Sequence, residues 1–270
     1  MTDMRKALDV RQWAAGLALL ILVAVTLPSV RPQIANVYEN AMFALAPSAE
    51  RAFEYGERHF NAKNPGFYDI DRARYFFQQA ALRDPSLPYL FHELARVSFL
   101  RGDYDTALAR IDFQISMHGD EAPNSYYVRG LIEGYMGKYD DAARDYAYYI
   151  SLEESPSWAS LNDYAWVLLK SERFQEALET TARGLEHFPD NPWLLNSHAT
   201  ALFELKEYQE ALKAAQKASV AVATITEDRW LRAYPGNDPK IAKDGIQAFK
   251  EAIKQNIHTI KSALSSNAVQ

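Results

Sequence analysis

The sequence of 270 residues predicts an all-α protein, in which a solenoid of about five helix–turn–helix units is closed by a C-terminal capping helix and preceded by one transmembrane helix. Three observations predict this fold: an uncharged apolar run near the N-terminus, a repeat of 34 to 35 residues, and the lack of strand-like alternation. The expected segments are a cytoplasmic tail (1–12), a transmembrane helix (13–30), a linker helix (31–50), the repeat array (51–224) and a capping helix with its tail (225–270).

The apolar run at residues 13–30 carries no charge, and eight of the eleven positions 17–27 are Leu, Ile or Val. As a helix it would span roughly 27 Å, close to the bilayer core of about 30 Å. A cleaved signal peptide and a buried core helix are the alternatives, but no small-x-small cleavage pattern directly follows the run. We therefore expect a membrane anchor.

Positive charges around this run predict its orientation. Arg5, Lys6 and Arg11 precede it, whereas Arg31 is the only basic residue that follows it before Arg51. Because cytoplasmic flanks carry the excess of Lys and Arg, the N-terminus is expected in the cytoplasm. The single-pass chain would then place its repeats outside the cytoplasm, in the periplasm if the organism is a Gram-negative bacterium.

A short linker helix is expected between the anchor and the repeats. Pro32 and Pro47 bracket this segment, in which a set of apolar residues shares one helical face. These residues are Ile34, Val37, Ala41 and Leu45. The helix either connects the anchor to the repeat domain or lies on the membrane surface.

The repeat is marked by aromatic residues 35, 35 and 34 positions apart, which are Tyr104, Tyr139, Phe174 and Tyr208. Alanine follows each of them three positions later, at Ala107, Ala142, Ala177 and Ala211. A small residue precedes each by nine positions, at Ala95, Gly130, Ala165 and Ala199. Small residues let two antiparallel helices cross closely, so each unit reads as a helical hairpin that must stack on its neighbours. An irregular unit precedes these four, with Gly56 as its small residue if extra residues lie around 61–67.

With this pattern, residues 51–224 resemble the tetratricopeptide-repeat family. The third unit departs from the pattern, because Arg129 and Glu133 stand where apolar residues are usual. These two residues are one helical turn apart, which favours an i,i+4 ion pair. The alternative is that Glu133 has an altered pKa and a functional role.

The C-terminal segment leaves the repeat and is expected to cover the open end of the array. Residues 234–239 carry a dense turn signal, after which Asp238 can cap a helix that has Pro239 at its first position. Apolar residues at helical spacing follow to about Leu264. The segment from Arg229 onward has seven basic and three acidic residues, which fits a solvated helix face or, alternatively, a weak site for an anionic partner.

No catalytic motif is present in the sequence. The six histidines do not form a zincin motif, and neither a phosphate-binding glycine loop nor a G-x-S-x-G motif occurs. The chain has no cysteine, which excludes disulfides, thiolate metal sites and a cysteine nucleophile. The net charge of −6 argues against nucleic acid as a partner. We therefore expect no enzymatic activity, cofactor, metal or small-molecule substrate.

The resemblance implies a binding groove for a partner protein. In the family, one stripe of each first helix lines a concave groove that holds extended or helical segments of other proteins. The corresponding residues here are Tyr89, His92, Arg96, Phe99, Tyr127, Leu131, Tyr135, Asn162, Trp166, Lys170, Asn196, Thr200 and Phe203. Their aromatic rings offer contact area, and the amides of Asn162 and Asn196 could bond a peptide backbone.

Two functions follow as hypotheses, and an enzyme whose catalytic triad is assembled from distant residues is a third alternative. The favoured one is a membrane-tethered scaffold or adaptor that binds a partner segment in the groove. The alternative is a structural subunit of an envelope assembly, which self-associates or packs through its convex face or its basic C-terminal cap.

Overall fold

The computed structural model describes residue 16 and residues 30–234 and 236–267. These residues divide into two compact units, one ending at Asp84 and the other beginning at Pro85. The predicted transmembrane helix at residues 13–30 lies outside the described residues, apart from Gly16 and Val30. Within the described part of the chain, no helix has both the length and the hydropathy needed to cross a membrane.

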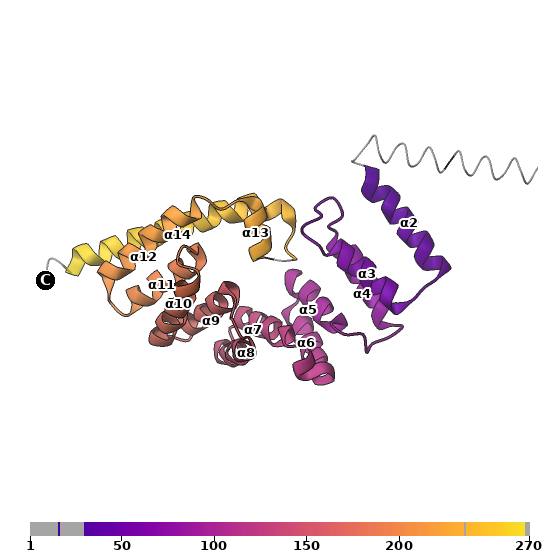
Figure 1. Ribbon diagram of the computed structural model, residues 1–270, viewed down its shortest axis with the longest axis horizontal. Coiled ribbons are helices and arrows are strands. Elements are labelled where there is room, and N and C mark those ends of the chain that lie inside the picture. The colour runs from indigo at the N-terminus through magenta and orange to yellow at the C-terminus, as the bar shows by residue number, and fades with distance from the viewer. Residues whose placement is uncertain (1–15, 17–29, 235, 268–270) are drawn as a thin grey trace, which may run out of the picture. The chain divides into compact units, whose positions relative to one another are not determined.

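The first unit contains α2 (Arg31–Leu45), α3 (Ala49–His59) and α4 (Ile70–Ala81), shown in indigo in Figure 1. Asp69 caps α4 by accepting hydrogen bonds from the backbone N–H groups of Asp71 and Arg72. A Cβ atom added at Gly56 would lie 2.5 Å from the ring of Phe77, so the two helices cross at the expected small residue. The extra residues expected around 61–67 lie in the loop between α3 and α4.

Helix α2 packs on this hairpin through a face that the sequence did not indicate. Its buried side chains are Glu39 and Phe43, and Phe43 contacts the ring of Phe76 edge-on at 5.7 Å. The predicted apolar face points away from the hairpin, since Val37 is 70% exposed and Leu45 is 80% exposed. The buried charge of Glu39 decides this orientation, because its partners lie on α3 and α4.

The second unit continues the hairpins and ends in the cap (Figure 1). Its hairpins are α5 (Leu90–Leu100) with α6 (Tyr104–His118), α7 (Asn124–Tyr135) with α8 (Tyr139–Leu152), α9 (Trp158–Lys170) with α10 (Phe174–His187), and α11 (Pro192–Glu204) with α12 (Tyr208–Val222). The cap follows as α13 (Glu227–Ala233) and α14 (Ala242–Asn267), and short 3-10 turns lie at η2 (Gly119–Glu121) and η3 (Pro239–Ile241). With α3 and α4, the described residues form five helical hairpins without a strand, which confirms the predicted all-α repeat fold.

Repeated small residues lie where each hairpin crosses. Ala95, Ala165 and Ala199 are fully buried on the first helices, and alanines three positions after the aromatic residues are fully buried on the second helices.

The turns between the two helices of each hairpin in the second unit are also alike. In each turn one residue adopts a left-handed conformation, at Gly102, Gly137, Glu172 and Lys206. The backbone N–H of the next residue then bonds a carbonyl five positions earlier, as from Lys138 to Glu133 at 2.9 Å.

The capping helix covers the last hairpin. Ile260 is buried against Ala211 and Ala215 of α12, and Ile253 is buried in a cluster with Ala218. As expected, Asp238 caps the segment by accepting a hydrogen bond from the backbone N–H of Lys240, although the cap begins η3 rather than α14 itself.

The expected ion pair between Arg129 and Glu133 is wrong. Arg129 instead forms two hydrogen bonds with the carboxylate of Asp145 on α8, at 2.6 and 2.8 Å, and a third with Asp112 on α6 at 3.1 Å. The fork geometry of a guanidinium favours this bidentate partner across the hairpin over a carboxylate on its own helix. Glu133 is left buried beside the pair.

Candidate functional site

The candidate site is the face formed by the first helices of the second unit, α5, α7, α9 and α11. Each of these helices contacts the next one. Side chains at equivalent positions therefore come together across neighbouring hairpins, and they form two rows with different chemistry.

A row of hydrogen bonds, here called the polar ladder, joins successive helices. His92 Nδ1 of α5 lies 3.3 Å from Ser125 Oγ of α7. The hydroxyl of Tyr127 donates to Asp163 Oδ2 of α9. The hydroxyl of Ser197 on α11 then donates to Asn162 Oδ1 at 2.9 Å.

The polar ladder continues into the cap. The amide of Asn256 on α14 donates to Asn196 Oδ1 on α11 at 2.8 Å. Asn162 also donates to the neighbouring Asp163 at 3.3 Å. The two asparagines predicted to bond a partner backbone are thus already bonded within the chain, and they hold the hairpins together.

Ionisation of the polar ladder is shifted by burial. Burial lowers the pKa of His92 to about 3, with a further contribution from the charge of Arg96, so this histidine is neutral at physiological pH. Burial raises the pKa of Asp163 to about 6, although the hydrogen bonds from Tyr127 and Asn162 act in the opposite direction. Asp163 is absent from the predicted site. Asp163 is next to the predicted site residue Asn162 in the sequence. Its hydrogen bond with Tyr127 depends on the packing of α7 against α9, which the sequence alone does not show.

A second row, here called the aromatic ladder, runs near the C-terminal ends of the same helices. It consists of Phe99, Tyr135 and Trp166. The ring of Tyr135 lies 5.0 Å from the ring of Phe99 and 5.4 Å from that of Trp166. Tyr104 and Tyr139 flank it at 6.2 Å from Tyr135 and 6.5 Å from Trp166. Tyr135 is 56% exposed, so the aromatic ladder offers a ring surface to solvent.

Gly134 explains how the aromatic ladder closes up. A Cβ atom at this position would lie 2.6 Å from Cζ3 of Trp166. The indole ring therefore rests directly on the backbone of α7, and any larger residue would push α9 or the ring away. This glycine, next to Tyr135 in the sequence, is therefore a packing residue.

The other predicted residues have mixed surroundings. Arg96 is held by Glu93, with its Nη1 2.8 Å from Oε2, and Tyr89 packs against the ring of His92 at 5.5 Å. Leu131 packs in the core cluster around Tyr146, and Thr200 donates to the carbonyl of Asn196 at 3.0 Å. Phe203 packs against Tyr208 at 5.5 Å, and Lys170 is exposed at the end of α9.

The opposite edge of the face is covered by the chain's own C-terminal segment. Trp193 at the start of α11 stacks between Trp158 of α9 and Phe249 of α14, at 4.8 and 5.4 Å. Its indole N–H donates to the hydroxyl of Tyr234 at 2.9 Å. The N-terminal ends of α9 and α11 are thus occupied, whereas Tyr135 of the aromatic ladder is exposed.

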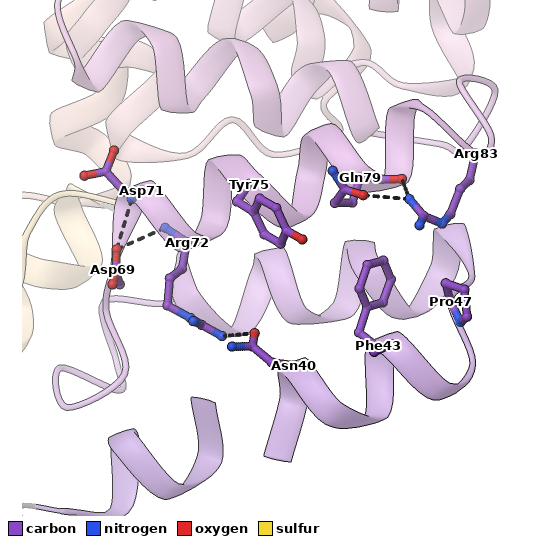
Figure 2. A pocket seen from close by; sticks show the side chains of 10 residues that line it. Asn40, Phe43, Pro47, Asp69, Asp71, Arg72, Tyr75, Gln79 and Arg83 are labelled. Carbon is purple, nitrogen blue, oxygen red and sulfur yellow. Dashed lines mark hydrogen bonds between the residues drawn. The ribbon is translucent and has the colours of Figure 1, made fainter. Parts of the chain in front are cut away.

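The first unit has a hollow of about 690 Å³ between α2 and α4, shown in Figure 2. Its basic side chains already have partners. Arg83 lies over the ring of Phe43 and donates to Gln79, while Arg72 donates to Asn40 at 3.2 Å. Among the described residues, no group of three His, Asp or Glu side chains could hold a metal ion.

The repeat pattern is matched by a known family. The model of the tetratricopeptide repeat matches residues 127–192 and 165–238. Residues 127–238 therefore contain tetratricopeptide repeats. Arrays of such repeats form extended concave surfaces that bind other proteins.

Solved structures of MamA proteins share the fold. A crystal structure of MamA has a TM-score of 0.55 and 15% sequence identity, and the match covers 65% of this chain and 92% of that one. MamA MSR-1 has a TM-score of 0.53 and 17% identity, with 63% and 96% covered. MamA AMB-1 has a TM-score of 0.51 and 16% identity, with 62% and 96% covered. At such identities the likeness concerns the fold alone, and no curated protein sequence matches significantly.

Proposed function

We propose that this tetratricopeptide-repeat protein is a membrane-tethered, non-enzymatic adaptor that binds a segment of a partner protein on the aromatic ladder. The observation that carries the proposal is the exposure of Tyr135 between Phe99 and Trp166, on three successive first helices. Aromatic rings provide much contact area for little loss of side-chain entropy, and they are enriched in the cores of protein interfaces.

The partner segment is proposed to bring apolar side chains rather than a bare backbone. The amides of Asn162 and Asn196 are bonded within the chain, so a strand would compete with the polar ladder for them. By contrast, the ring of Tyr135 is exposed, so a partner could contact it without breaking a hydrogen bond of the polar ladder. An amphipathic helix or an extended segment with apolar side chains fits this chemistry.

The tether is proposed to be the apolar run at residues 13–30, with the repeats outside the cytoplasm. Its favourable composition and the excess of basic residues before it support this arrangement. Confinement near the membrane raises the effective concentration of the face for other envelope proteins, so a modest affinity suffices.

Photo-crosslinking tests the adaptor proposal. A benzoylphenylalanine placed at Tyr135 in the full chain, expressed in its own cells, should capture one protein that mass spectrometry identifies. The same group placed at Phe113, an exposed residue of α6, is the matched control and should not capture it. The yield at position 135 should fall when Trp166 is changed to Ala. Equal capture at both positions would exclude the aromatic ladder as the binding site.

Self-association through the convex face remains the second candidate. Phe113 and Met117 of α6 and Leu152 of α8 are exposed apolar side chains on the second helices. If the group at Phe113 captured a second copy of the chain, the structural-subunit function would replace the adaptor.

A further inference from the structure

Helix α2 is held in one rotational position by a buried cluster of charges. Glu39 is fully buried; its Oε1 accepts a hydrogen bond from Arg58 at 2.7 Å, and its Oε2 lies 2.7 Å from His59 Nε2. Arg72 of α4 adds a third contact with Oε2 at 3.4 Å. Rotation of α2 about its axis would break this cluster and leave a buried carboxylate without partners.

The opposite face of α2 is therefore presented outward, and it carries no charge from Ile34 to Leu45. Val37, Tyr38 and Leu45 are 70%, 60% and 80% exposed, and Ala41 is exposed between them. Val37, Ala41 and Leu45 fall on one stripe of the helix, because they are spaced four residues apart, and Tyr38 lies beside them on the same face. A soluble helix would place polar residues on such a face.

We propose that this outward face of α2 lies against the lipid bilayer. Its apolar side chains lie below the lipid headgroups, and the ring of Tyr38 lies at the level of the headgroups. The inference rests on the membrane tether of the proposed function. The uncharged run ends at residue 30, and α2 begins at Arg31 without an intervening linker. A chain that leaves the bilayer there brings the stripe to the interface from the second turn of the helix.

A second copy of the chain is a poorer occupant for this stripe. A standard protein interface uses roughly 20–30 residues on each side, whereas the outward face of α2 offers three large apolar side chains. Weak insertion suffices for a lipid surface, since the tether has already brought the helix there. Docking would fix the orientation of the first unit on the membrane.

Depth-dependent quenching tests the docking. The chain has no cysteine, so Val37→Cys and Leu45→Cys each give a single site for a bimane label in the full chain. Gln78→Cys, an exposed position on α4, is the matched control. The labelled proteins are reconstituted in phosphatidylcholine vesicles that contain 5-doxyl lipid. Quenching at positions 37 and 45 should exceed that at position 78 by at least about two-fold.

The outcomes separate the docking from the tether. If the full chain does not co-migrate with the vesicles in a flotation gradient, the proposed membrane tether is wrong, and the proposed docking is then wrong as well. If the chain floats but positions 37 and 45 are quenched no more than position 78, only the docking is wrong. Oxidative crosslinking between two Val37→Cys chains would place a second copy on the stripe and overturn the inference.

A further variant tests whether the apolar stripe itself keeps α2 on the bilayer surface. A label at Ala41→Cys should be quenched in the otherwise unchanged protein. In a background that carries Val37→Asp and Leu45→Asp, the chain should still float, but the quenching at position 41 should fall to that at position 78. Both replaced side chains are exposed, so the fold of the unit should survive the change. Quenching that persisted in this background would contradict docking through the stripe.

Discussion

At the scale of single residues, Glu172 and Lys206 occupy a backbone conformation that the earlier hairpins of the second unit assign to glycine. Their φ angles are +58° and +66°, and the equivalent residues are Gly102 and Gly137. A side chain in the left-handed region costs about 1–2 kcal/mol through its contact with the backbone. The turns of the last two hairpins therefore carry backbone strain, whereas the equivalent turns of the two hairpins before them have glycine and avoid it.

Replacing Lys206 by Gly is expected to raise the free energy of unfolding by about 0.5–1 kcal/mol, because relief of the strain outweighs the extra freedom of glycine in the unfolded chain. Denaturant unfolding measures this change. The control is Lys213→Gly in the helical interior of α12, which should lower the stability by about 1 kcal/mol. A loss of stability with both variants would show that the turn at Lys206 carries no strain.

The buried Glu133 is expected to make the free energy of unfolding depend on pH. It is 9% exposed, and its Oε2 has no hydrogen-bond partner among the described residues. Burial, with the nearby charge of Asp145, raises its pKa from 4.5 to about 7 despite the opposing charge of Arg129. Between these pH values the folded state binds more protons than the unfolded state, so the stability falls as the pH rises.

The variant Glu133→Gln keeps the shape and cannot ionise. It is expected to raise the free energy of unfolding by about 1–3 kcal/mol at pH 8 and to change it little at pH 4. Thermal or denaturant unfolding at both pH values tests this, with the exposed Glu154→Gln as the control. An equal effect of Glu133→Gln at both pH values would mean that the carboxyl does not titrate in this range.

Residue positions set by local spacing could be predicted from the sequence, and cross-helix partners could not. The small residues at the hairpin crossings follow from a fixed distance to the aromatic residues. The pairing of Arg129 with Asp145 depends on how α7 lies on α8, and the bond from Tyr127 to Asp163 on how α7 lies on α9. The sequence of a single helix therefore predicted the wrong ion-pair partner, Glu133, for Arg129, and it did not indicate Asp163 as the partner of Tyr127.

At the scale of elements, the first part of the cap packs on the last hairpin through aromatic rings. Trp230 of α13 is 9% exposed and lies 4.5 Å from the ring of Tyr234 and 6.2 Å from that of Trp193. A Cβ atom at Gly245 of α14 would lie 2.4 Å from Cζ2 of Trp230, so the indole fills the space between α13 and α14. The packing of α13 against α14 thus depends on one large side chain.

The variant Trp230→Ala is expected to lower the free energy of unfolding by about 3–5 kcal/mol, because it leaves a cavity between the two helices of the cap. Equilibrium unfolding followed by far-UV circular dichroism measures the loss. Ile241→Ala, at a half-exposed position of η3, is the control and should cost less than about 1 kcal/mol. Similar losses for the two variants would argue against a packed cap.

The orientation of α2 also belongs to this scale. Its apolar periodicity predicted a helix correctly, but the stripe was not the face that packs on the hairpin. The hydrophobic pattern alone could not reveal this, since the packed face is chosen by the partners of Glu39 on other helices.

At the scale of the whole molecule, the interiors of the two units differ. The first unit contains a fully buried carboxylate, Glu39, whose charged partners lie on other helices. Burial would raise the pKa of this carboxyl, but the hydrogen bonds and charges of His59 and Arg58 outweigh burial and lower the pKa below 4.5. Its contribution to stability is therefore full above about pH 4.5 and is lost as the pH falls through the lowered pKa.

Hydrogen exchange should reveal this difference between the units. Amide protection in residues 31–81 is expected to fall more steeply between pH 5 and pH 3 than protection in residues 90–222, after correction for the intrinsic exchange rates. The variant Glu39→Gln should lower the stability of the first unit by about 2–4 kcal/mol at pH 7 and remove this steep fall. A parallel loss of protection in both units would contradict the role of Glu39.

The order of the helices along the chain has a consequence for biosynthesis. The buried isoleucines of α14 cover the alanine-rich side of α12, and they are synthesised after it. Until Ile260 has left the ribosome, the last hairpin keeps an uncovered apolar side. A chain that terminates between α12 and α14 should therefore expose this apolar side and be prone to aggregate or to be degraded.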